Sequence, residues 1–186
     1  MSGGDGALAA ASAPVTQGTV RFLLVLALLG VVGLALWAMR RGWVRRGRRQ
    51  ADVPAPAPPP ARLSAPLVDR LDGLYVGTVR SGDWLDRIVA HGLGTRSAAS
   101  LTVTAEGVLL DRAGGAELFV PATALRAVSL QRGIAGRVYE AHGVLVLTWS
   151  LGDLVLDTGF RARHTADHEA VAVAVAGLVH AQEGAA

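Results

Sequence analysis

Two pairs of titratable residues have the spacing of catalytic or metal-binding groups. Asp83 and Asp86, in GDWLD, could form an acid pair for proton transfer. Their place at the entry to a strand favours a turn cap and a solvated side chain instead. His164 and His168 are four residues apart, so they could share one helix face as metal ligands do. No third ligand is evident beside them, which favours solvated histidines at the start of a helix.

The amino-acid composition excludes several kinds of catalytic group. The 186 residues include no cysteine, so the chain has no disulfide framework, thiolate metal site or cysteine nucleophile. All 18 basic residues are arginine, which excludes a Walker-type or Schiff-base lysine. Ser97 and Ser100 have no base identifiable nearby. We therefore expect a protein without enzymatic activity, cofactor or metal.

Two clusters have the residue types of a binding site. In RGIAGR, residues 132–137, an arginine stands at each end of a glycine-containing loop, so Arg132 and Arg137 could hold a phosphate with backbone N–H groups. The alternative is a surface loop with solvated arginines. In DTGFRAR, residues 157–163, Phe160 lies between Asp157 and Arg161, and an exposed aromatic there would suit a partner contact. The alternative is that Phe160 packs under a helix.

An apolar run near the N-terminus is the segment that would anchor the rest of the chain to a membrane. Residues 22–39, FLLVLALLGVVGLALWAM, carry no charge and would span roughly 27 Å as a helix, close to the apolar thickness of a bilayer. We predict a membrane-spanning helix over residues 20–39, with Phe22, Leu29, Leu36 and Met39 in the span. A cleaved signal peptide is the alternative, but it would need its positive cluster before the apolar run.

The positive cluster follows the run instead. It consists of Arg40, Arg41, Arg45, Arg46, Arg48 and Arg49. Because arginine near a span stays in the cytoplasm, we expect a single-pass protein of the cell (inner) membrane, with residues 1–19 outside and the C-terminal part inside. The cluster would also attract anionic lipid headgroups. A nucleic-acid arm is the alternative, but from residue 62 onwards 11 arginines face 13 acidic residues, so the domain lacks the basic surface that nucleic acid needs.

The chain after residue 40 divides into an arginine-rich segment (40–50), a proline-rich linker (51–66), a domain (67–182) and a short tail (183–186). The linker, ADVPAPAPPPARLSAP, holds six of the eight prolines. Such a run favours polyproline II, and it predicts a semi-rigid spacer that could extend to roughly 50 Å. A ligand for a proline-recognition domain is the alternative.

The sequence pattern of the domain predicts short strands followed by one helix. Strands are predicted in residues 73–80, 84–94, 117–121 and 124–132, and hairpins in 100–112 and 143–161, turning at AEG and LGD. Trp84 and Trp149 are expected in the core. Residues 165–184 predict a helix capped by Thr165, whose apolar face would close the open end of a barrel. The expected fold is a mainly β barrel of about seven strands with a C-terminal helix.

This order, with the motifs YVGT (75–78), GDWLDRI (82–88), RGIAG (132–136) and LDTGFR (156–161), resembles the small actinobacterial single-pass membrane proteins with a PH-like domain. The resemblance implies a binding module for lipid headgroups, peptides or other proteins. With the predicted span and the slightly acidic domain, we expect the lipid bilayer and an unknown cytoplasmic protein as partners, and no nucleic acid. We expect a scaffold or adaptor. The alternative is a sensor or transport accessory protein that reads a small anionic metabolite through Arg132 and Arg137.

Overall fold

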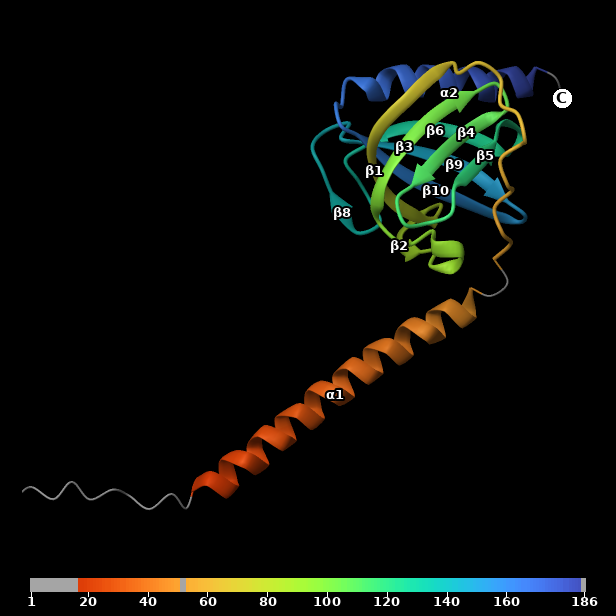
Figure 1. Cartoon of the computed structure of the whole chain (residues 1–186). Helices are drawn as coiled ribbons and strands as arrows, with labels where there is room; N and C mark the ends of the chain where they lie inside the picture. Colours follow the sequence, from red (N-terminus) through yellow and green to blue (C-terminus); the bar gives the residue numbers. More distant parts are fainter. Residues whose placement is uncertain (1–16, 51–52, 185–186) are drawn as a thin grey trace, which may run out of the picture. The chain divides into compact units, whose positions relative to one another are not determined.

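The computed structural model describes residues 17–50 and 53–184, which belong to two compact units, residues 1–45 and 46–186 (Figure 1). The first is essentially one helix, α1 (Gln17–Arg49). Its segment Val20–Gly42 has a mean hydropathy of 2.6 and is long and apolar enough to cross a membrane. Phe22, Leu29, Leu36 and Met39 are all exposed along it, as side chains that face lipid would be.

The limits of α1 differ from the prediction at both ends. The helix begins at Gln17, inside the predicted tail, of which residues 1–16 lie outside the described part. It also continues beyond residue 39 through the arginine-rich segment to Arg49. Arginine is a good helix former and no proline interrupts these residues, so the backbone has no local reason to stop at the end of the apolar run.

The second unit is built on an antiparallel sheet. Its eight strands are β1 (Val68–Arg80), β2 (Asp83–Arg87), β3 (Ser97–Thr104), β4 (Gly107–Arg112), β5 (Leu118–Pro121), β6 (Leu125–Gln131), β9 (Val144–Leu151) and β10 (Leu154–Ala162). The order is β5-β4-β3-β1-β10-β9-β6, and β2 pairs with β1 beside this path. The turns expected at AEG and LGD join β3 to β4 and β9 to β10, as predicted.

The C-terminal helix α2 (Asp167–Glu183) packs against β6 and also contacts β1, β3 and β4 (Figure 1). It reaches both halves of the sheet because the sheet curves round the larger of two hydrophobic clusters. Val171 and Val175 on its inner face are fully buried, with Leu178 and Val179 partly buried against the same core. The predicted mainly β domain closed by a C-terminal helix is therefore confirmed.

Two local predictions about the domain are wrong. Trp149 lies in the core, but Trp84 is 49% exposed, because β2 is a short side strand that pairs only with β1. The helix is not capped by Thr165; Ala166 is the N-cap residue and no side chain caps the end. Asp167 and Glu169 do lie in the first turn, where the helix dipole favours negative charge.

The proline-rich segment differs from a free spacer. Val53, at its start, is buried in the main core, and its carbonyl lies 2.8 Å from His91 Nε2. Ser64, near its end, donates from both its backbone N–H and its hydroxyl to Glu106. Between these anchors the described residues run beside the sheet (Figure 1). The segment is therefore part of the domain and does not hold it at a distance.

Candidate functional site

The RGIAGR sequence forms a small hairpin instead of an open loop. β7 (Gly133–Ile134) pairs with β8 (Arg137–Val138), and Ala135 and Gly136 turn between them with φ of 55° and 72°. The Ala135 carbonyl accepts a hydrogen bond of 2.6 Å from Arg87. Arg132 and Arg137 are both exposed, one at the base of the hairpin and one at its turn. Their predicted role in binding stays a prediction.

The second predicted cluster is divided by the pleat of β10. Phe160 is fully buried, so its prediction as an exposed partner contact is wrong. Asp157 points to the outer face but accepts a hydrogen bond of 2.7 Å from the Thr148 hydroxyl. Arg161, also on the outer face, lies 2.7 Å from Glu140 and stacks 5.2 Å from the Tyr139 ring centroid. Alternating side chains point to opposite faces of a strand, which is why Phe160 and Arg161 separate.

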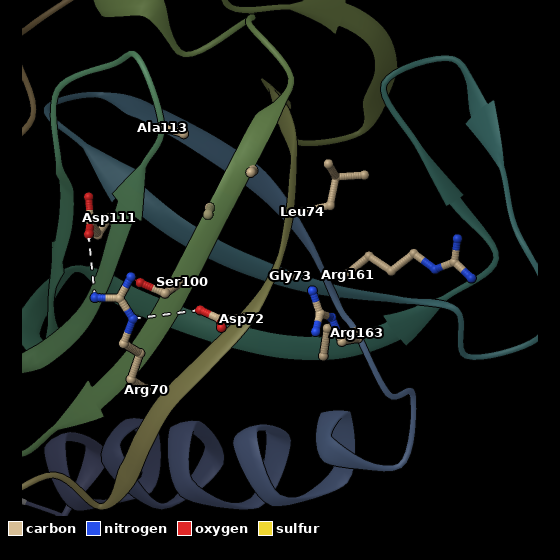
Figure 2. Close-up of a pocket in the computed structure, with 12 residues that line it drawn as sticks. Arg70, Asp72, Gly73, Leu74, Ser100, Asp111, Ala113, Arg161 and Arg163 are labelled. Atoms are coloured by element: carbon tan, nitrogen blue, oxygen red, sulfur yellow. Dashed lines mark ion pairs between the residues drawn. The ribbon is translucent and has the colours of Figure 1, made fainter.

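Arg161 also lines a pocket of about 580 Å³ on the outer face of β1, β3, β4 and β10 (Figure 2). The sequence did not predict this pocket. Small residues at neighbouring register positions form its floor: Gly73, Ala98, Ala99, Ser100, Ala113 and Ala162. The hollow exists because none of these side chains extends beyond the sheet surface. We call this surface the outer-face pocket. Only the pairing of strands 25 to 90 residues apart brings its residues together, so no local motif signals it.

Charged side chains form the rim of the outer-face pocket. Arg70 lies 3.6 Å from Asp72 and 3.7 Å from Asp111, as the dashed lines in Figure 2 mark. These pairs are exposed, so each contributes little to stability. Arg163, at the other end, is exposed and makes no ion pair with any described residue. The rim therefore offers the Arg163 guanidinium without an ion pair in the described part of the chain, while Arg70 shares its single charge between two carboxylates.

Glu140 adds a fixed negative charge next to this rim. A hydrogen bond from its own backbone N–H, followed by the charge of Arg161, lowers the pKa of Glu140 below its usual value. The carboxylate therefore stays ionised through the neutral range and keeps Arg161 engaged. Of the two arginines at this end of the pocket, Arg161 on β10 and Arg163 just after it, Arg163 is the one available to a ligand.

The domain interior holds a chain of hydrogen-bonded polar side chains. Tyr75 donates to the Leu93 carbonyl at 2.7 Å, and its oxygen lies 2.7 Å from Thr78 Oγ1. Thr78 lies 2.8 Å from Thr158, which accepts from Trp149 Nε1 at 2.9 Å. Burial raises the pKa of Tyr75 to about 12, so its phenol stays neutral near pH 7.

The predicted histidine pair is also separated. His168 is buried, whereas His164 is exposed, so the prediction of two solvated histidines is wrong for His168. His168 Nε2 accepts from the Ala162 N–H at 2.9 Å, which leaves Nδ1 to donate to the His142 carbonyl at 3.0 Å. Within residues 17–50 and 53–184, no group of three or more histidine, aspartate or glutamate side chains could hold a metal ion.

The arginine-rich segment is only partly described. Arg40 and Arg41 are exposed on α1, and the Arg41 guanidinium lies 5.2 Å from the Trp37 ring centroid. The side chains of the other four arginines lie outside the described part, so their predicted lipid contacts stay a prediction: Arg45, Arg46, Arg48 and Arg49.

Comparison with known proteins bears on the second unit. The family model described as bacterial PH domain-like matches residues 52–176, which is more than half of the chain. No curated protein matches the chain. The matched range begins ahead of the prolines and ends inside α2, so it includes the proline-rich segment that packs on the sheet and leaves α1 out. The chain belongs to the bacterial PH domain-like family.

Proposed function

We propose that this protein is a membrane-anchored binding module without enzymatic activity, an adaptor that holds a protein partner at the cytoplasmic face of the membrane. The observation that carries the proposal is the outer-face pocket, a shallow hollow with a floor of small residues and a charged rim (Figure 2). Arg70, Asp72 and Asp111 are exposed and paired with one another. Arg163 makes no ion pair with any described residue, so the pocket offers contacts to a ligand but no positioned acid, base or nucleophile.

The anchoring part of the proposal rests on α1. Its apolar segment Val20–Gly42 can cross a bilayer, and six arginines lie at or just beyond its C-terminal end, against Arg21 at the other. Arginine is retained on the cytoplasmic side of a span, which favours a single pass with the N-terminus outside. The PH-like domain would then lie in the cytoplasm, close to the inner membrane.

The chemistry of the pocket suggests the kind of partner. Leu74, Ala98 and Ala113 offer apolar surface, while Arg163 offers a guanidinium without an ion pair among the described residues. A short protein segment with an acidic side chain beside a small apolar one would satisfy both. A contact centred on an arginine over a small-residue floor resembles the anchors that contribute most at protein interfaces.

A small anionic ligand is a second candidate, and one observation favours it. Arg163, just after β10, lies at the rim without an ion pair among the described residues, and Ser100 lies on the floor, on β3 between β1 and β4 (Figure 2). A guanidinium and a hydroxyl suit a phosphate or carboxylate. In this candidate the protein is a sensor or transport accessory protein, and the pocket takes the place of Arg132 and Arg137.

Crosslinking in intact cells, followed by membrane pull-down and mass spectrometry, tests the adaptor. The variant is Ala98→Tyr with Arg163→Ala, which fills the exposed floor and removes the free guanidinium. The matched control is Arg132→Ala with Arg137→Ala on the β7–β8 hairpin. We expect a protein partner with the wild type and the control but not with the pocket variant. Loss in the control alone would move the contact to the hairpin. Recovery of no specific protein with the wild type would refute the adaptor.

A further inference from the structure

Strand β2 displays two large apolar side chains that the domain does not bury. Trp84 is 49% exposed and its neighbour Leu85 is 64% exposed. The strand is held in this position, because Asp83 Oδ1 accepts hydrogen bonds from the backbone of Leu85 at 3.0 Å and Asp86 at 3.2 Å. Two large apolar side chains that stay exposed on an ordered strand indicate a surface that another molecule covers.

The chain enters the domain next to this pair. Gln50 donates to the Arg87 carbonyl at 3.0 Å and accepts from the Val89 backbone at 2.6 Å. Arg87 is the last residue of β2 and lies three positions after Trp84, a distance of about 10 Å. The side chain of Gln50, the residue that follows α1, is therefore fixed at the end of the strand that carries the exposed pair.

The length of chain between the apolar segment and Gln50 is short. The segment ends at Gly42 and α1 continues to Arg49. Eight residues cover about 12 Å as a helix, and no more than ~28 Å when fully extended. The headgroup layer on each side of a bilayer is about 5–8 Å thick. Gln50, and with it the end of β2, is therefore confined to the neighbourhood of the membrane surface.

We propose that Trp84 and Leu85 insert into the interfacial layer of the same bilayer that α1 spans. The inference rests on the membrane anchoring proposed above. An indole ring is well suited to the headgroup region, where its ring is buried and its N–H stays wet. Arg80 and Asp86 next to the pair neutralise each other at 3.3 Å. The contact is thus apolar and does not depend on lipid charge.

Lipid quenching of tryptophan fluorescence in the full-length protein tests this contact. Trp37→Phe and Trp43→Phe leave Trp84 and the buried Trp149 as emitters. Reconstitution is into uncharged phosphatidylcholine with brominated acyl chains, with aqueous acrylamide as the opposing quencher. We expect brominated lipid to remove most of the Trp84 emission, acrylamide to have little effect, and high salt to change neither result.

The matched control places the indole elsewhere on the same domain. Adding Trp84→Phe and Val173→Trp moves the exposed ring to α2, which lies across the domain from β2, at a position that is 68% exposed (Figure 1). We expect this ring to respond to acrylamide and not to brominated lipid. The same pattern for Trp84, with α1 resisting alkaline extraction, would overturn the membrane contact alone. Extraction of the protein from the vesicles would overturn the anchoring itself. Shielding of Trp84 only after cytosolic protein is added would assign the pair to a protein partner and also overturn the contact.

Discussion

At the scale of single residues, the hydrogen bonds of the interior polar chain can be donated in only one direction. The Tyr75 hydroxyl gives its hydrogen to the Leu93 carbonyl, so Thr78 must donate to Tyr75. Thr158 must then donate to Thr78 and accept from Trp149. Every donor in the chain is used, which is the condition under which a buried polar network stabilises a core. Its members come from β1, β9 and β10, so the network ties the centre of the sheet together.

This network predicts loss of stability in alkali. Burial raises the pKa of Tyr75 to about 12, above the usual value near 10 in the unfolded chain. The unfolded state therefore loses its proton first, and the contribution is complete below about pH 10 and falls as the pH rises towards about 12. Two pKa units correspond to roughly 2–3 kcal/mol. We expect the free energy of unfolding to fall by this order over that range, measured by denaturant unfolding.

The amino-acid composition leaves few other side chains that titrate in this pH range. No lysine titrates in the same range, and only two tyrosines are present. Tyr75→Phe keeps Tyr139 and removes the buried phenol, so its stability should be lower at neutral pH but should not show the same alkaline decline. An equal decline in both proteins would exclude Tyr75 as its source.

At the scale of elements, the segment ahead of β1 differs most from its predicted role as a spacer. The Gln50 side chain satisfies the Val89 and Ala90 N–H groups with one oxygen, and Val53 fills a place in the core. These contacts fix the start of η1 (Ala90–Gly92), which follows β2. The match to the family beginning at residue 52 agrees with a domain that includes this segment.

Gln50→Ala is expected to loosen η1 without unfolding the sheet. The change leaves the Val89 and Ala90 N–H groups without their partner, which costs about 1–3 kcal/mol where they stay shielded from water. Hydrogen exchange should therefore quicken at residues 88–93 and stay unchanged in β9 and β10. Pro58→Ala, at an exposed position of the same segment, is the control. Unchanged exchange at 88–93 in Gln50→Ala would mean that Gln50 does not hold η1.

The same elements show which parts of the fold could be read from sequence. The hairpins at AEG and LGD, the buried Val171 and Val175, and the apolar helix follow from local patterns of period two or 3.6. The proline-rich segment was predicted as a spacer because its composition favours polyproline II, whereas its attachment depends on contacts of Val53 and Ser64 with residues 38 and 42 positions away. The outer-face pocket depends on register between distant strands, which no local pattern encodes.

At the scale of the whole molecule, charge is divided sharply along the chain. Seven of the 18 arginines lie before residue 62, whereas 13 of the 15 acidic residues lie after it. The excess positive charge next to Val20–Gly42 therefore belongs to the chain near the apolar segment and not to the PH-like domain. Because residues near a span decide its orientation and distant domains contribute little, this segment should fix the topology.

The absence of cysteine allows that topology to be measured directly. Ser12→Cys and Glu117→Cys place single thiols on either side of the apolar segment in an otherwise thiol-free chain. We expect a membrane-impermeant maleimide to label the Ser12→Cys protein in intact cells and the Glu117→Cys protein only after permeabilisation. Changing Arg45, Arg46, Arg48 and Arg49 to glutamate should weaken this asymmetry, since the retention signal is then largely removed. Labelling of Glu117→Cys in intact cells would place the domain outside and contradict the proposed cytoplasmic adaptor, whereas unchanged asymmetry in the glutamate variant would show that Arg40 and Arg41 suffice to orient α1.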